Sequence, residues 1–480
     1  MSDQICNQLI LMSDEHTRKV LGCYGNAVVR TPNLDRLAER GTRFENAYTP
    51  VPICVPARAT FATGRYGHQT GHWDNATPYY GEPKSWGHHL QAAGVEVGSI
   101  GKLHYRNVED QVGLDFQQIP MHVVNGVGDV LGCVREPLPK RWKSHAMAEK
   151  IGAGETNYTE YDRDIAERSA AWLRKKATEK SPRPWVLFVS MVAPHFPLIA
   201  PKEFYDIYAD AGLMPSKPKP EADHPWLAAM RNCVLYDNFT PERTHIALTA
   251  YYGLVSFMDA NVGKVLDALK ETGLSKKTQV VYTSDHGDNI GERGLWGKSN
   301  MYEESVGVPM ILAGPNIPSG HVCHTPVSLL DIAPTVLKTA GVIATHDNFP
   351  GQSLAELATS PDAPERTVIS EYHAMGSLSG AFMVRKGRWK LIYYHGFEPQ
   401  LFDLLTDPEE LTDLGQNPKY ERTRADLLHE LTSVCNPNEV DIRAKADQFK
   451  IVKEHGGIDH VVKKGGFGAT PPPGSSPAYS

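Results

Sequence analysis

The sequence predicts an α/β fold in which helices sandwich a large, mostly parallel (mixed) sheet, with a smaller C-terminal α+β subdomain that carries a short antiparallel sheet. Three observations support this prediction. Apolar runs typical of buried parallel strands recur up to about residue 360, and segments with helical periodicity separate them. Beyond that point, short strand-like runs follow one another with only turns between them.

In the first part of the chain, five apolar runs predict strands, at 8–13, 95–100, 185–192, 278–283 and 308–312. Helical patterns lie between them, at 32–40, 86–94, 162–180 and 244–271. The first helix has the clearest boundaries, because Thr31 is a typical N-cap, Pro32 suits the first helical position and Gly41 ends the pattern. Strands that alternate with helices indicate a mostly parallel sheet.

In the C-terminal part, a helical pattern at 418–434 follows strand-like runs at 368–373, 382–385, 389–394 and 401–404. We therefore divide the chain into a main domain (1–360), a C-terminal subdomain (361–450) and a tail (451–480). The end of the tail is rich in glycine, proline and serine and cannot build a core. It predicts a flexible end, or an arm that docks on a neighbouring subunit of a homo-oligomer.

Composition and cysteine spacing argue against several classes of protein. The 480-residue chain has a net charge of -7, which gives no support for nucleic-acid binding. It has no apolar run of about 18 residues, so we expect no membrane span. The N-terminus lacks the basic region and apolar core of a signal peptide, so we expect a cytoplasmic protein. The seven cysteines are scattered without a Cys-x-x-Cys pair, which argues against a disulfide framework or a structural zinc site.

Polar side chains follow directly after four of the predicted strands. In chain order they are Asp14, Glu15, Lys102, His104, His195, Asp285 and His286. In open α/β sheets, ligands bind beyond the carboxyl ends of the strands, so we expect these residues to share one rim. The irregular segments at 106–160 and 215–240 are expected to form loops that line the substrate site.

A candidate nucleophile, Cys54, lies in the stretch Cys54-Val55-Pro56-Ala57-Arg58. Pro56 suits the first position of a helix that ends near Gly64, which would place Cys54 at a helix N-terminus, where free N–H groups favour an anion. Arg58 can point back toward the same anion. Taken alone, however, a cysteine in an apolar stretch is more often a small buried hydrophobic residue.

Asp14, Glu15, Asp285 and His286 predict one divalent metal. Hard oxygen donors favour Ca²⁺ or Mg²⁺, and calcium is our first choice, while the histidine admits Mn²⁺ or Zn²⁺. Taken alone, Asp14-Glu15 or Asp285-His286 is more often a pair of ordinary loop residues. Two such pairs at strand ends, with Cys54 between them in the sequence, favour a metal site. Three carboxylates and the ion sum to about -1, and Arg58, Lys102 and Lys298 bring this to about +2, which suits an anionic ester.

The pattern Cys54-x-Pro56-x-Arg58 resembles the core signature of type I sulfatases, a family of the alkaline-phosphatase-like superfamily. The likeness runs from Gln8 to roughly Leu414, and the chain is most similar to the group of choline sulfatases, arylsulfatases and phosphonate monoester hydrolases. The segments that carry it, in the family's order, are Asn75, 101–104, 194–195, 284–288, 291–298, 388–392 and 400–404.

The resemblance implies that a formylglycine-generating maturation enzyme oxidises Cys54 to formylglycine, whose hydrate attacks sulfur and then expels sulfate. The implied metal site comprises Asp14, Glu15, Asp285 and His286, with the modified Cys54. By the same resemblance, His104 orients the formylglycine and His195 protonates the leaving oxygen. The residues implied to grip the sulfuryl oxygens are Arg58, Asn75, Lys102 and Lys298.

The sequence also departs from the family pattern. Many sulfatases have two aspartates after the first strand and Asp-Asn after the later one, where this chain has Asp14-Glu15 and Asp285-His286. Ala57 stands where a serine is often found. The histidine moves the chain toward the phosphonate hydrolases and leaves the choice of metal open. His373 is a candidate for the rim of the cleft, with a structural role as the other interpretation.

We therefore expect a formylglycine-dependent hydrolase of small anionic sulfate monoesters. One alternative is a phosphonate monoester or phosphodiester hydrolase that uses the same site. A second is a non-catalytic protein that binds metal or anions on this scaffold. A plain cysteine hydrolase is disfavoured, because it would need no metal and would be inactivated by thiol alkylation.

Overall fold

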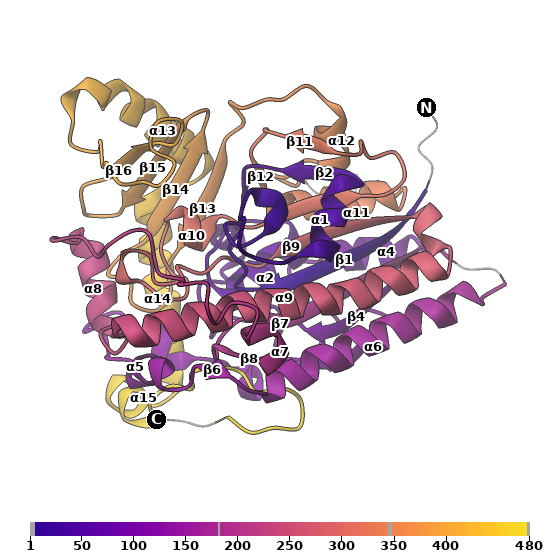
Figure 1. Cartoon of the computed structure of the whole chain (residues 1–480). Coiled ribbons are helices and arrows are strands. Elements are labelled where there is room, and N and C mark those ends of the chain that lie inside the picture. Colours follow the sequence, from indigo (N-terminus) through magenta and orange to yellow (C-terminus); the bar gives the residue numbers. More distant parts are fainter. Residues whose placement is uncertain (1–4, 181–182, 344–347, 478–480) are drawn as a thin grey trace.

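The computed structural model describes residues 5–180, 183–343 and 348–477, apart from the side chain of Lys143 (Figure 1). Within these residues, eight strands form the main sheet, in the order β11-β2-β10-β9-β1-β7-β4-β5. Five neighbouring strands, which include the edge strand β5, are parallel: β9 (Thr278–Ser284), β1 (Asn7–Asp14), β7 (Trp185–Pro194), β4 (Glu96–Lys102) and β5 (Phe116–Met121). At the other edge, β10 (Met310–Ala313) runs antiparallel to β9 and β2 (Gly41–Phe44), and β11 (His321–Cys323) pairs parallel with β2.

Helices cover both faces of this sheet because its central strands are apolar on both sides. Leu9 and Leu11 of β1 belong to a core formed with α1 (Pro32–Glu39), α6 (Asn157–Ala177) and α9 (Pro241–Glu271), the last two crossing the front of Figure 1. Ile10 and Met12 belong to a second core with α2 (Cys54–Thr63), α4 (Trp86–Ala92) and α11 (Ile332–Thr339). Alternate residues of one strand thus bury against opposite helix layers.

The C-terminal sheet is antiparallel, as predicted, and its strands follow one another in chain order: β13 (Val368–Tyr372), β14 (Ala381–Lys386), β15 (Trp389–Tyr394) and β16 (Gln400–Asp403). Helix α13 (Glu421–Val434) packs on β14 and β15. The predicted fold class is therefore confirmed in both parts. The shorter elements are β3 (Ala47–Tyr48), α3 (Gly67–Thr70), α5 (Trp142–His145), β6 (Gly152–Ala153), β8 (Ile199–Ala200), α7 (Lys202–Tyr205), α8 (Pro225–Val234), α10 (Glu303–Val306), β12 (Val327–Ser328) and α12 (Leu354–Thr359).

Three local details differ from the predictions. Helix α2 begins at Cys54, with Ile53 as the extended N-cap, and not at Pro56 as predicted, while its end at Gly64 agrees with the prediction. The Thr31 side chain makes no cap hydrogen bond; its hydroxyl bonds to Asp35 in the first turn instead. Strands β2, β5 and β11 were not predicted, since β2 and β11 are short and β5 is an edge strand with two glutamines and no apolar run.

The segment predicted as a flexible tail is largely folded. Helix α14 (Pro437–Glu454) extends into it, and α15 (Ile458–Lys464) follows. Val452 and Val461 of these helices are buried in a small core with Leu131 and Cys133. The described residues after α15, 465–477, contain no further helix, and the last part of the predicted tail, 478–480, lies outside the described residues. Among the described helices, none has the length and apolar character that crossing a bilayer requires.

Candidate functional site

The carboxyl ends of four parallel strands deliver the predicted residues to one rim. Asp14 is the last residue of β1 and Lys102 the last of β4, while His195 follows β7 and Asp285 follows β9. Strand β1 pairs in parallel with both β7 and β9, so their ends lie next to each other. The rule that ligands bind beyond the carboxyl edge of such a sheet therefore applies to this chain.

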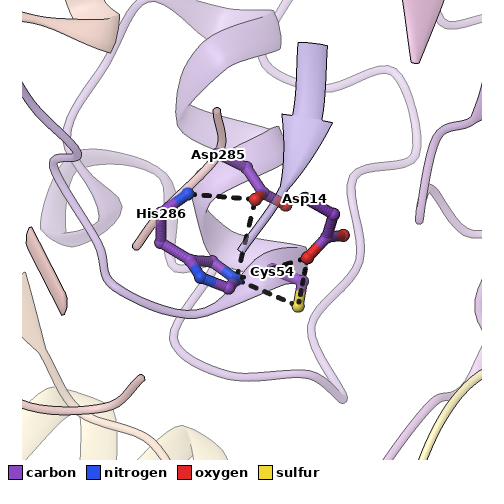
Figure 2. Close-up of side chains that lie close together, drawn as sticks. All are labelled: Asp14, Cys54, Asp285 and His286. Atoms are coloured by element: carbon purple, nitrogen blue, oxygen red, sulfur yellow. Dashed lines mark hydrogen bonds and ion pairs between the residues drawn. The ribbon is translucent and has the colours of Figure 1, made fainter. Parts of the chain in front are cut away.

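Four of the predicted metal ligands form one compact cluster (Figure 2). Ligand atoms of Asp14, Cys54, Asp285 and His286 all lie within 4.8 Å of one another, and all four residues are buried. The Sγ atom of Cys54 is 3.1 Å from Nε2 of His286 and 3.8 Å from Oδ1 of Asp14. Helix α2 makes this approach possible, because its first residue meets the ends of β1 and β9.

Glu15 lies beside this cluster rather than within it. One of its carboxylate oxygens, a possible metal ligand, lies close to ligand atoms of Asp14 and His195. Its Oε2 accepts a hydrogen bond of 3.1 Å from Nζ of Lys298. The other oxygen, Oε1, is buried without a hydrogen-bond partner. Burial is the main reason why the pKa of Glu15 is well above its usual value.

Arg58 holds the two aspartates of the cluster. Its Nε donates to Oδ2 of Asp285 at 2.9 Å, and its Nη2 donates to Oδ2 of Asp14 at 3.2 Å. Its Nη1 donates to the Lys102 carbonyl and to Oγ of Ser190, each at 2.8 Å. The side chain is 1% exposed and is not among the residues that line the adjoining cavity. In this structure, Arg58 therefore contacts the carboxylates and lies away from the space a sulfuryl group would enter.

The other predicted site residues line a common cavity. They are Glu15, Cys54, Asn75, Lys102, His104, His195 and Lys298. Lys102 forms an ion pair with Asp14, and Oδ1 of Asn75 accepts a hydrogen bond of 3.1 Å from the Val55 amide. Burial opposes ionisation of Asp14, but Lys102, followed by His195 and Arg58, holds the pKa of Asp14 well below its usual value. The carboxylate is thus ready to face a cation.

His195 and Lys298 form a defined pair. Nδ1 of His195 donates to the Phe196 carbonyl at 2.7 Å, which leaves Nε2 to accept from Nζ of Lys298 at 3.1 Å. Burial and then Lys298 hold the pKa of His195 well below its usual value. Burial opposes the charge of Lys298, but Cys54, Glu15 and Asp14 hold its pKa well above the usual value. The proton of this pair therefore resides on the lysine.

His104 and Cys54 show the unusual environments typical of a functional site. His104 adopts a left-handed backbone, with φ of 54°, and both of its ring nitrogens are buried without a partner. Burial, with Asp14 as the next cause, raises the pKa of the Cys54 thiol to about 11. An unmodified Cys54 would thus be a protonated thiol near neutral pH, which disfavours the plain cysteine hydrolase.

Several cavity residues were not predicted. They are Asp129, Arg141, Tyr236, Trp296, Phe467 and Thr470, among others. Loops expected to line the site, at 106–160 and 215–240, supply the first three, but no sequence pattern identified the individual residues. Phe467 and Thr470 lie in the segment predicted as a flexible tail. His373 is not among the cavity residues; its Nε2 lies 3.1 Å from Oε2 of Glu371, in agreement with the structural interpretation.

Comparisons with known proteins agree with this geometry. The family model described as sulfatase matches residues 7–342, and the model described as N-sulphoglucosamine sulphohydrolase, C-terminal, matches residues 291–436. Choline-sulfatase of Rhizobium meliloti is 35% identical over 429 residues, 86% of this chain and 83% of that protein. Arylsulfatase K of Homo sapiens is 29% identical, over 90% of this chain and 82% of that protein.

Two solved structures share the fold. The phosphonate monoester hydrolase of Agrobacterium radiobacter matches with a TM-score of 0.74 at 20% identity, over 89% of this chain and 95% of that chain. A protein solved in complex with its substrate, D-glucosamine-2-N,6-O-disulfate, matches with a TM-score of 0.71 at 22% identity, over 92% and 99%. Because the sulfatase model matches well over half of the chain and choline-sulfatase is similar across most of both sequences, this chain belongs to the sulfatase family of the alkaline-phosphatase-like superfamily and is a sulfuric ester hydrolase.

Proposed function

We propose that this protein hydrolyses sulfate monoesters with a formylglycine made from Cys54 and one divalent metal. The observation that carries the proposal is the position of Cys54. It is the first residue of α2, lines the cavity and has its Sγ within 4 Å of Asp14 and His286. Sulfatases in general combine a metal with formylglycine, and a maturation enzyme would have to oxidise Cys54 in this chain.

The residues at the rim fit a divalent cation. Asp14, Cys54, Asp285 and His286 would hold it, with Glu15 at the edge of the set. The buried Oε1 of Glu15 has no hydrogen-bond partner, and a buried carboxylate oxygen requires either a donor or a cation. Carboxylate oxygens favour calcium, and the imidazole keeps Mn²⁺, Mg²⁺ and Zn²⁺ as alternatives. A bound cation would act as a Lewis acid toward the sulfuryl oxygen and the nucleophile.

Residues of the chain itself would bind the sulfuryl group, orient the nucleophile and position the carboxylates. Lys102, Lys298 and Asn75 line the cavity and would bind the sulfuryl oxygens, where negative charge develops. His104 would orient the modified Cys54, and Arg58 would keep the metal-binding carboxylates in place. The hydrate of formylglycine has two hydroxyl groups, so one can attack sulfur and the other can later expel sulfate by C–O cleavage, an exit that serine or cysteine lacks.

The leaving oxygen needs a proton, and His195 would supply it. Nδ1 of His195 is committed to the Phe196 carbonyl, so Nε2 is the atom that would deliver a proton. Lys298 donates to this nitrogen and holds the proton in the structure described. In each turnover, His195 would take up a proton from solvent at Nε2 and deliver it to the departing alcohol, while Lys298 keeps its own charge for the sulfuryl oxygens.

A second candidate function is hydrolysis of phosphonate monoesters or phosphodiesters at the same site. The observation that favours it is His286, which stands in the cluster where many sulfatases have an amide. Specificity constants for an aryl sulfate, an aryl phosphonate monoester and a phosphodiester distinguish the two. We expect the aryl sulfate to have the highest value; a higher value for either phosphorus ester would favour the alternative.

The direct test of the proposed function is production together with a formylglycine-generating enzyme, followed by an aryl sulfatase assay. We expect turnover in the native protein and its loss in Cys54→Ala. Cys323→Ala is a matched control, because Cys323 is also buried but lies in β11, away from the cavity. Binding of sulfate without turnover in the co-produced protein would instead indicate a non-catalytic anion-binding protein.

A further inference from the structure

We propose that Asp129 and Arg141 recognise the alcohol half of the substrate and select a hydroxylated, sugar-like alcohol over a quaternary ammonium alcohol. This inference rests on the proposed function. Both residues line the same cavity as Cys54, Lys102 and His195, so a group attached to the sulfuryl oxygen can reach them. We call them the Asp129–Arg141 pair.

The pair is buried and only partly satisfied. Nη2 of Arg141 donates to Oδ2 of Asp129 at 2.6 Å, and the two residues are 8% and 7% exposed. Nη1 of Arg141 and Oδ1 of Asp129 are buried and have no hydrogen-bond partner. A buried charged group with an unused donor or acceptor is costly, and such groups in native proteins are usually completed by a ligand or water.

The two unused atoms require opposite partners. Nη1 of Arg141 needs an acceptor, and Oδ1 of Asp129 needs a donor. A hydroxyl group is both, so two neighbouring hydroxyls of a sugar ring can satisfy both atoms together. A trimethylammonium group has no hydrogen-bond donor or acceptor and can satisfy neither.

The charges that line the cavity also favour a neutral hydroxylated alcohol over a quaternary ammonium alcohol. Among the described residues that line the cavity, the carboxylates are Glu15 and Asp129, and each faces a cation of its own, Lys298 and Arg141. A quaternary ammonium ion would therefore find no uncompensated carboxylate and would meet the Arg141 guanidinium, which repels it. A neutral hydroxylated alcohol has no such penalty.

The cavity also offers flat apolar surface. Trp296 lines it and is held by stacking on Phe239, with ring centroids 4.1 Å apart and planes 16° apart. Phe467 lines it as well. Large aromatic side chains provide apolar contact area, which suits the C–H face of a sugar ring.

The backbone fixes the pair relative to the sulfuryl site. The Asp129 amide donates to the Asn75 carbonyl at 3.1 Å, and Oδ1 of Asn75 in turn accepts from Val55, next to Cys54. Gly128 makes this approach possible, because a Cβ there would lie 1.9 Å from the Asn75 oxygen. The Arg141 amide donates to the Cys233 carbonyl at 2.8 Å. The alcohol subsite and the sulfuryl subsite are thus parts of one rigid framework.

The experiment compares specificity constants for N-acetyl-D-glucosamine 6-sulfate, choline O-sulfate and 4-nitrophenyl sulfate. In the native protein we expect the sugar sulfate to exceed choline O-sulfate. In the double variant Asp129→Asn/Arg141→Gln, which removes both charges together, we expect the ratio of the sugar sulfate to 4-nitrophenyl sulfate to fall at least about tenfold. A control away from the cavity is Asp403→Asn/Arg388→Gln, an Asp–Arg pair at the C-terminal sheet that is more exposed than the Asp129–Arg141 pair and should keep the native ratio.

Arg141→Lys provides a second, milder variant, since it keeps the charge and loses the forked donor; we expect a smaller fall in the same ratio. An unchanged ratio in both variants, or a native preference for choline O-sulfate, would overturn the inference. If 4-nitrophenyl sulfate itself is not hydrolysed, the proposed function fails instead. In that case, the affinity for the sugar sulfate, measured by calorimetry, tests whether Asp129 and Arg141 bind the alcohol half. Equal affinities of the native and double-variant proteins would overturn that assignment.

Discussion

At the scale of single residues, the site is a set of buried charges that compensate one another. Asp14 faces Lys102 and Arg58, Asp285 faces Arg58, and Glu15 faces Lys298. Buried ions are stable only when such partners are in place, so removing one partner leaves the other uncompensated. We therefore expect substitutions at these positions to affect both metal binding and turnover.

Lys102→Ala should lower turnover of an aryl sulfate by about a hundredfold or more, because a fixed cation at the developing negative charge is lost. Steady-state kinetics with matched thermal melts provide the measurement. Lys176→Ala is the control, since Lys176, like Lys102, is a buried lysine paired with a carboxylate, here that of Glu96, but lies on α6, away from the cavity. Native turnover in Lys102→Ala would remove Lys102 from the site.

Arg58→Lys should weaken binding of the divalent metal by roughly tenfold to a hundredfold, because a lysine cannot hold both Asp14 and Asp285. Metal content after dialysis against graded chelator concentrations measures this. Metal affinity should fall by more than the turnover of the metal-saturated protein does. Unchanged metal affinity together with lost turnover would instead place Arg58 on the substrate.

At the scale of elements, the strand ends were predictable and the loops were not. A strand has a period and a direction, so the apolar run before Asp14 or Asp285 implies which edge these residues occupy. Asp129 and Arg141 meet only because irregular chain crosses the rim, and no periodic pattern encodes that crossing. Phe467 was missed for a related reason, since a glycine- and proline-rich segment has no periodicity that predicts a fixed position.

The contact between α3 and β13 includes an ion pair whose contribution to stability depends on pH. Oε1 of Glu371 accepts from the His68 amide at 2.9 Å and lies 3.1 Å from Nδ1 of His68. Burial opposes protonation of His68, but Glu371 raises the pKa of His68 above its usual value. This contribution to stability is present below the unfolded pKa of histidine and is lost as the pH rises through the higher folded value.

We therefore expect the melting-temperature difference between the native protein and Glu371→Gln to be larger near pH 5.5 than near pH 8.5, values that lie on either side of about 6.5, the usual histidine pKa. Thermal melts at both pH values measure this. A difference that is equal at both, or larger at the higher pH, would show that the His68–Glu371 ion pair does not contribute.

At the scale of the whole molecule, the C-terminal segment returns to the rim of the sheet. Phe467 and Thr470 line the cavity, and the hydroxyl of Tyr158 donates to the Thr470 carbonyl. The C-terminal segment thus helps to enclose the cavity to which we assign the chemistry of residues 14–298. The division into three domains and the homo-oligomer stay predictions.

Deleting residues 465–480 should raise the KM for a sulfate ester about tenfold, because the apolar wall that includes Phe467 is lost. The fold should persist, since α14 and α15 remain. Kinetics and thermal melts of the truncated protein measure both effects. An unchanged KM would mean that the segment does not contact the substrate.

The most direct test of the central claim is peptide mass spectrometry across Cys54, combined with aryl sulfate turnover of the same preparations. Samples produced with graded amounts of the maturation enzyme would differ in the fraction of Cys54 present as aldehyde. We expect turnover to rise in proportion to that fraction and to vanish where Cys54 is a thiol. Full turnover with an unmodified thiol, or none with a complete aldehyde and bound metal, would contradict the proposed chemistry.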